Sequence, residues 1–97
     1  MSKREQYIEK ITAELKKLDA EIEKLEAKAQ ESQADAKGQY DEQIKELKSQ
    51  REQVEKRFDE LSQASAEAWD TLKSGFESSW NLFKSSVHDA MSKFPEK

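Results

Sequence analysis

Residues 66–94 of this chain read AEAWDTLKSGFESSWNLFKSSVHDAMSKF, and their composition differs sharply from the charged sequence before them. Large apolar side chains recur here every three or four residues, so that on an α-helix they would share one face. Serines occupy much of the opposite face, and Pro95 would end the helix, because a residue before proline is biased out of the α region. The spacing predicts an amphipathic helix with an aromatic face made of Trp69, Leu72, Phe76, Trp80, Phe83, Val87, Met91 and Phe94.

Something must cover this aromatic face, because each aromatic side chain can remove about 150–250 Å² of surface from water. The first interpretation is that the face packs on the rest of the chain or on the same segment of other copies. The second is that it docks on lipid, since bulky residues opposite a serine-rich face with little net charge are typical of helices that detect lipid packing. The third is that it binds a client or partner protein. We favour the first interpretation and expect a homo-oligomer.

The charged sequence before residue 65 carries a much narrower apolar stripe. Its apolar residues recur alternately three and four apart, which is the heptad pattern of a coiled-coil seam. Ser2 and Glu5 have the spacing of a capping box and mark the start of a first helix. Arg51 interrupts the pattern, and the spacing alone does not explain it. The seam comprises Ile11, Leu15, Leu18, Ile22 and Leu25 in a first segment, and Ile44, Leu47, Val54, Phe58 and Leu61 in a second.

The two seam segments are separated by a sequence typical of a helix end. Lys37 is followed by Gly38, which can adopt the left-handed conformation that often terminates a helix. We therefore expect a turn near residues 35–39, which would fold the two segments into a hairpin.

Flanking charges favour an antiparallel pairing of the two segments. This pairing places Glu14 near Arg57 and Glu26 near Lys48, whereas a parallel dimer in register would bring acidic residues together. Each exposed pair in a helix contributes only about 0.3–0.5 kcal/mol, so the charges indicate a direction and add little stability.

The fold class predicted from these patterns is all-α. We expect a charged coiled-coil region over residues 1–64 that forms an antiparallel helical hairpin, followed by the aromatic, serine-rich amphipathic helix over residues 65–97. The alternative is one long continuous helix that assembles with other chains. The 72 residues from Ile11 to Phe83 correspond to about 20 helical turns, so a straight helix would keep the seam and the aromatic face on one side.

Composition narrows the functional classes. The 97 residues include 39% charged side chains, a net charge of −4, no cysteine and one histidine, His88. Nucleic acid is excluded as a partner, because it rewards clustered positive charge. One histidine without cysteine cannot supply a relayed nucleophile or a histidine metal cluster, so we expect no enzyme activity, metal or cofactor. The N-terminus lacks an apolar signal segment and no stretch is long enough to cross a bilayer, so we expect a cytoplasmic protein.

Three stretches resemble a group of small bacterial coiled-coil proteins that are commonly labelled as stress-response proteins. They are REQYIEKITAELKKLDAEIEKLEAKA (4–29), YDEQIKELKSQREQVEKRFDEL (40–61) and SAEAWDTLKSGFESSWNLFKSS (65–86), with AWDTLKSGFESSW (68–80) as the most distinctive part. The resemblance implies a cytoplasmic helical protein and carries over no catalytic residue. The C-terminal region is also similar in pattern to phasins, which coat storage granules, and to apolipoprotein-like amphipathic helices.

These observations predict a non-enzymatic, stress-associated helical interaction protein that self-assembles through its aromatic face. Two alternatives use the same face differently. One is a coat protein for lipid or granule surfaces, and the other is a holdase-like chaperone that binds client proteins.

Overall fold

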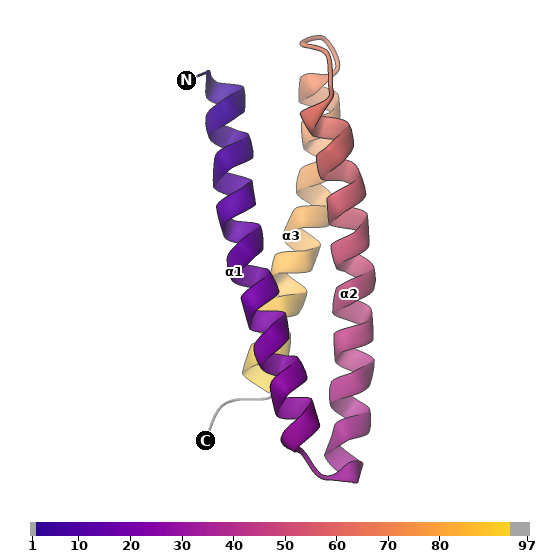
Figure 1. Ribbon diagram of the computed structural model, residues 1–97. Helices are drawn as coiled ribbons and strands as arrows, with labels where there is room; N and C mark the ends of the chain where they lie inside the picture. The colour runs from indigo at the N-terminus through magenta and orange to yellow at the C-terminus, as the bar shows by residue number, and fades with distance from the viewer. Residues whose placement is uncertain (1, 94–97) are drawn as a thin grey trace.

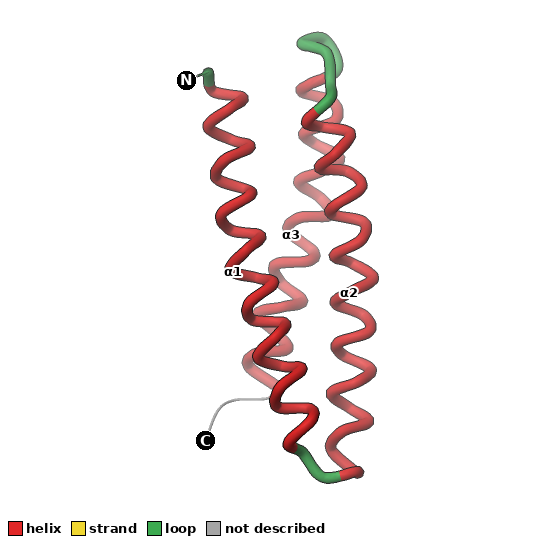
Figure 2. The backbone as a smooth tube through the Cα atoms, viewed as in Figure 1, coloured by secondary structure: helices red, strands yellow, loops and turns green. Residues whose placement is uncertain are grey.

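The computed structural model describes residues 2–93 of the chain. These residues form three α-helices: α1 (Lys3–Glu31), α2 (Ala34–Ser62) and α3 (Trp69–Lys93) (Figures 1 and 2). No β-strand occurs among them, so the prediction of an all-α fold is confirmed. The chain is elongated, with extents of 51 × 21 × 16 Å.

Each helix runs antiparallel to the one before it, so α1 and α3 point in the same direction (Figure 1). The interface between α2 and α3 is the most extensive of the three, and that between α1 and α3 is the smallest. The predicted hairpin of the first two helices is therefore present, and the alternative of one continuous helix is wrong for this structure. Because α3 packs back on both helices, the hairpin forms one side of a three-helix bundle and is not a free-standing coiled coil.

The start of α1 is capped as the sequence predicts. The Ser2 hydroxyl oxygen accepts a hydrogen bond from the backbone N–H of Glu5 over 3.1 Å, and the hydroxyl donates to the Glu5 carboxylate over 3.3 Å. Arg4 then donates a 2.8 Å hydrogen bond to the backbone carbonyl of Ser62. Because the last carbonyls of a helix lack partners within the helix, this contact ties the start of α1 to the end of α2.

The turn between α1 and α2 lies at Ser32 and Gln33, so the turn expected near residues 35–39 was placed too late. Ser32 takes an extended conformation, with φ −81° and ψ 159°, and its hydroxyl donates a 2.8 Å hydrogen bond to the carbonyl of Ala29. This side-chain bond satisfies a carbonyl at the helix end without a left-handed residue. Gly38 is consequently not a helix stop and lies inside α2.

Ion pairs fix the register of the hairpin. Lys48 pairs with Glu26 at 3.3 Å, as the antiparallel arrangement predicts. Arg51, which interrupts the seam, bridges Asp19 of α1 at 2.9 Å and Glu55 of its own helix at 3.1 Å. The hydrogen bond that the Arg51 guanidinium donates to the Asp19 carboxylate raises the pKa of Arg51 above its ordinary value. Arg51 therefore places a positive charge between two acids that would otherwise repel each other across the hairpin.

The second expected cross-hairpin pair is absent from the described part of the chain, where Glu14 and Arg57 form no ion pair. The Arg57 guanidinium instead lies against α3 at Gly75. The expected pair was derived from α1 and α2 alone. Because α3 packs beside Arg57, the guanidinium contacts α3 and does not reach Glu14.

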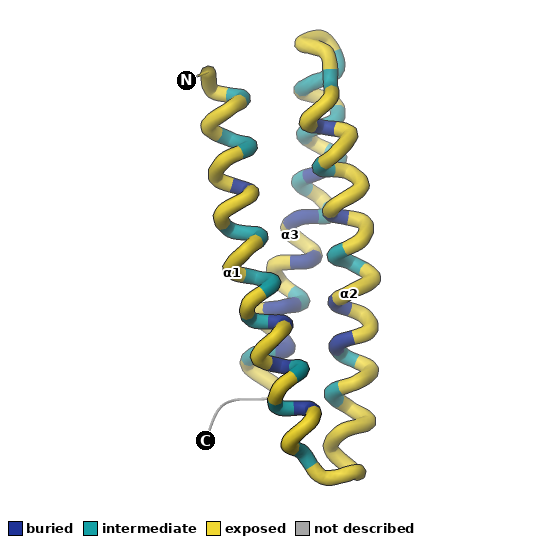
Figure 3. The backbone as a smooth tube through the Cα atoms, in the orientation of Figure 1, coloured by how far each residue is buried: buried dark blue, intermediate teal, exposed yellow. Residues whose placement is uncertain are grey.

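The core runs along the axis of the bundle, where buried positions of all three helices face inward (Figure 3). Every predicted seam residue is buried or partly buried. The buried set is Ile11, Ile22, Leu25 and Ala29 from α1, Ile44, Leu47, Val54 and Leu61 from α2, and Phe76, Trp80, Phe83, Val87 and Ala90 from α3.

Replacing Gly38 with alanine should raise the free energy of unfolding by about 0.5–1 kcal/mol, because glycine in a helix interior is unfavourable. A Cβ at this position would meet no atom within 4 Å. Urea unfolding followed by circular dichroism measures the change. Gly75→Ala is the matched comparison and should gain less, because its Cβ would lie 3.4 Å from the Arg57 guanidinium. Loss of stability in Gly38→Ala would contradict a turn at residues 32–33.

Candidate interaction surface

The aromatic face of α3 points into the bundle. Phe76, Phe83 and Val87 are 0% exposed and Trp80 is 3% exposed. Three further members, Trp69, Leu72 and Met91, are partly buried against the core, and Phe94 lies outside the described residues. The rest of this chain therefore provides the cover that the sequence requires for these rings.

The rings of this face continue into a ladder that includes the other two helices. Phe76 is its centre: its ring centroid lies 6.4 Å from that of Tyr7 in α1 and 5.5 Å from that of Phe58 in α2. Trp80 stacks on Phe76 at 5.8 Å, and Trp69 meets the Tyr7 ring edge-on at 5.9 Å. Such offset and edge-to-face pairs add about 0.5–1.5 kcal/mol each beyond their burial. The ladder therefore joins all three helices.

Two members of this ladder differ from the expectations based on sequence. Tyr7 was not assigned to any apolar stripe, although it precedes Ile11 by four residues and thus shares its helix face. Phe58 was assigned to the seam between the first two helices, but its ring packs on Phe76 of α3. Both cases follow from the third helix, which brings rings on α1 and α2 into contact with the aromatic face.

Cationic side chains cover the outer edge of the ladder. The Arg4 guanidinium lies 4.8 Å from the centre of the Trp69 ring, and the Lys73 ammonium lies 4.7 Å from the centre of the Tyr7 ring. Lys84 is 6.0 Å from the centre of the Trp80 ring. Each contact is a cation–π interaction worth about 0.5–1 kcal/mol at exposed sites. These lysines keep their charge in water while their alkyl chains cover apolar surface.

An 11-residue repeat in α3 accounts for the positions of both lysines. Eleven residues make about three helical turns, so residues separated by 11 lie nearly in line along the helix. The segment from Trp69 is repeated from Trp80, and this repeat is the signal that would have identified the lysines. The matched pairs are Trp69 and Trp80, Leu72 and Phe83, Lys73 and Lys84, Ser74 and Ser85, and Phe76 and Val87.

Tyr7 is the one neutral polar group whose ionisation the structure changes substantially within residues 2–93. Burial raises the pKa of its phenol to about 12, and the charge of Glu77 together with a hydrogen bond to that carboxylate adds to the shift. Lys73 lies over the same ring and pairs with Glu77 at 4.0 Å. The phenol of Tyr7 is therefore held protonated between α1 and α3.

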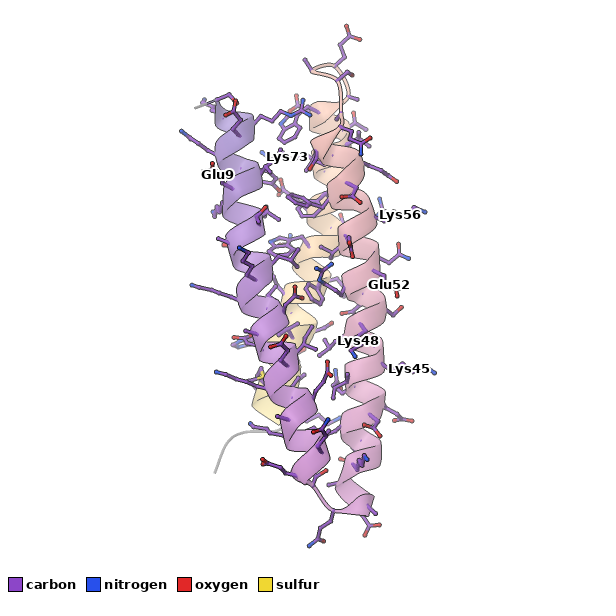
Figure 4. All side chains as sticks on the ribbon, in the orientation of Figure 1. Glu9, Lys45, Lys48, Glu52, Lys56 and Lys73 are labelled. Atoms are coloured by element: carbon purple, nitrogen blue, oxygen red, sulfur yellow. The ribbon has the colours of Figure 1, made fainter. Side chains whose placement is uncertain are left out.

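The outer surface offers little else that could form a site. A shallow groove between α1 and α3 is lined by Leu18, Glu21, Lys84, Ser85, His88 and Asp89. Across the described 92 residues, no group of three His, Asp or Glu side chains is arranged to hold a metal ion. Glu52 and Lys56 of α2 point away from the bundle (Figure 4). Leu82 is the one large apolar side chain left exposed in residues 2–93, at 59%.

Comparison with protein-family models, with curated proteins and with solved structures finds no match. No helix in the described part of the chain is long and apolar enough to cross a membrane. The functional interpretation therefore depends on two features of the structure. One is the buried aromatic face of α3, and the other is the helix α1 that covers part of this face.

The free energy of unfolding should fall between pH about 10 and 12 more steeply for the native chain than for Tyr7→Phe. Below pH about 10, Tyr7 is protonated in both the folded and the unfolded state. Between these values the unfolded phenol loses its proton while the folded one, with a pKa of about 12, keeps it, so ionisation favours the unfolded state. Urea unfolding across this range measures both slopes, and the variant corrects for lysine titration. Equal slopes would contradict the protected position of Tyr7.

Proposed function

We propose that this chain is a non-enzymatic, stress-associated helical protein that self-assembles, with the aromatic face of α3 as its assembling surface. The stress association follows from the resemblance described above. The observation that supports self-assembly is the unequal cover of the aromatic face. It is held to α2 by the most extensive helix interface and to α1 by the smallest.

The closed bundle hides this face, so assembly requires that part of its cover is exchanged. Phe76 and Phe83 are fully buried, and no second surface could reach them while α1 stays in place. The cover supplied by α1 is an amphipathic helix with a narrow apolar stripe. A helix of the same kind from another copy could occupy the same groove, since amphipathic helices bind apolar grooves through residues spaced three and four apart.

Charge pairs make up part of the attachment of α1 to α2. Its contact with α2 includes the Arg51–Asp19 pair, and the Asp19 side chain is 40% exposed. A charge pair of this kind contributes little net stability, because the cost of desolvation offsets the attraction. α1 adds four buried residues to the core, as α2 does, but one of them is the small Ala29, and both interfaces of α1 are smaller than the interface between α2 and α3. These features make α1 the helix most easily released.

A second candidate function, a coat for lipid or granule surfaces, is favoured by the 11-residue repeat. The repeat places Lys73 and Lys84 in line beside the apolar face, where their charges would remain in water while the rings enter a surface. A lipid surface would then replace α1 and α2 as the cover of the rings. Self-assembly remains the first choice, because the face already binds helices of this chain.

Sedimentation of the native chain from low micromolar to millimolar concentration tests self-assembly. We expect a helical monomer that converts to dimers or larger species as concentration rises. In a mixed sample of isotope-labelled and unlabelled chains, nuclear Overhauser contacts between chains should involve the rings of α3. Leu82→Ser is the matched control and should assemble normally, because Leu82 lies outside the aromatic face.

A helical monomer at every concentration would overturn this function, and so would assembly that is lost in Leu82→Ser. The same preparation, floated with neutral vesicles, decides the second candidate. Binding to vesicles that replaces assembly would support the coat function, and no binding would reject it.

A further inference from the structure

The connection between α1 and α2 has the composition of a helix. It consists of two non-helical residues, Ser32 and Gln33, and no residue between 2 and 93 has a positive φ. Residues 28–37 read KAQESQADAK, with neither glycine nor proline. Most of these residues have good or moderate helix propensity. The sequence therefore allows the helix to continue through the turn.

The bent form of this connection lacks several backbone hydrogen bonds that a straight helix would make. Gln33, the N-cap of α2, makes no side-chain capping hydrogen bond. The first N–H groups of α2 have no acceptor within α2, and the last carbonyls of α1 have no donor within α1. Straightening the turn would join these donors to these acceptors as the ordinary hydrogen bonds of one helix.

The apolar stripe would also stay on one side of a helix that continued through the turn, since its members remain three or four residues apart. On a continuous helix, the positions between the two seam segments would carry small or aromatic side chains that point to the same side. The continuous stripe would be Leu25, Ala29, Ser32, Ala36, Tyr40, Ile44 and Leu47. A straightened chain would therefore present one uninterrupted apolar side to a partner.

We infer that two copies of this chain exchange α1, so that residues 3–62 form one continuous helix and each α1 packs on α2 and α3 of the other copy. This inference rests on the proposed self-assembly. It specifies that the partner is a second copy of this chain and that the two copies associate by exchanging α1. The continuous helix of 60 residues would be about 90 Å long. Two such helices would run antiparallel and be related by a two-fold axis near the turn.

The exchange conserves the contacts of α1. The pairs Asp19–Arg51 and Glu26–Lys48 and the ring contact between Tyr7 and α3 would each form again between copies, with the same geometry. The exchanged dimer thus differs from two closed monomers by the straightened turn and by the new contact where the two turns meet. The two turns would meet near residues 35–37, where Asp35 and Lys37 carry opposite charges.

The other connection, residues 63–68, is less suited to exchange. Ser65 caps the approach to α3, because its hydroxyl oxygen accepts a 3.2 Å hydrogen bond from Ala68 and its carbonyl accepts a 3.0 Å bond from Trp69. Release of α3 would also break the most extensive helix interface of the bundle. The shorter turn before α2, in which the N-cap residue Gln33 makes no side-chain capping hydrogen bond, is the one that opens.

Two substitutions move the equilibrium in opposite directions. Ala34 is the first residue of α2, where proline is well tolerated, and the extended conformation of Gln33, with ψ 160°, suits a residue before proline. Ala34→Pro therefore fits the closed hairpin but breaks a continuous helix, and should weaken dimer formation at least tenfold in sedimentation. Ser32→Ala removes the hydrogen bond to Ala29 that holds the bend, and should strengthen dimer formation several-fold. Circular dichroism confirms that both variants stay helical.

A carbodiimide cross-link between Glu26 and Lys48 identifies the exchange directly. Light and heavy isotope-labelled chains are unfolded together in urea, refolded at high concentration, separated by size and cross-linked. In the dimer fraction we expect joined Glu26 and Lys48 peptides of mixed isotope, and in the monomer fraction only peptides of one isotope. Dimers whose cross-links stay within one chain, or an Ala34→Pro variant that dimerises like the native chain, would overturn the exchange while leaving self-assembly intact. A native chain that never dimerises would overturn both.

Discussion

Phe76 is the side chain on which the three helices converge. It lies on α3, is fully buried, and its ring contacts Tyr7 of α1, Phe58 of α2 and Trp80 of its own helix. The first two helices alone offer only a narrow aliphatic stripe, which suits a coiled coil but forms a thin core. The rings of α3 supply the missing apolar volume. Both α1 and α2 pack against these rings and shield them from water.

Polar contacts determine the alignment of the helices around these rings. The bridge from Arg51 to Asp19 and the Glu26–Lys48 pair set the register of α1 against α2, and Arg4 joins the start of α1 to the end of α2. Such exposed or partly exposed pairs add little stability, but a different register would separate them. The bundle thus combines a strong apolar attachment of α3 with a weaker, charge-aligned attachment of α1. This difference in strength is the physical basis for our proposal that the aromatic face of α3 can exchange one covering helix for another.

The sequence predicted those features that depend on periodicity, which include the three helical segments, the antiparallel seam and the aromatic face. It did not predict features that depend on which helices meet. Gly38 was expected to end a helix because glycine commonly does so, but the Ser32 hydroxyl satisfies the helix end six residues earlier. Tyr7 belongs to the aromatic cluster only because α3 returns to the start of α1. Whether a face packs on its own chain or on another depends on the relative free energies of the monomer and the assembly. The spacing of residues along one chain does not predict this difference.

The most direct test of the central role of Phe76 is the free energy of unfolding of Phe76→Ala beside that of Leu82→Ala, measured by urea unfolding of each variant. The two side chains lie on the same helix, but Phe76 is 0% exposed and Leu82 is 59% exposed. Loss of a buried phenylalanine costs about 3–5 kcal/mol, whereas substitution at an exposed position usually changes stability by less than about 0.5 kcal/mol. We predict this large difference, including the case in which Phe76→Ala does not fold at all. Equal and small effects in the two variants would contradict a bundle that depends on the burial of Phe76.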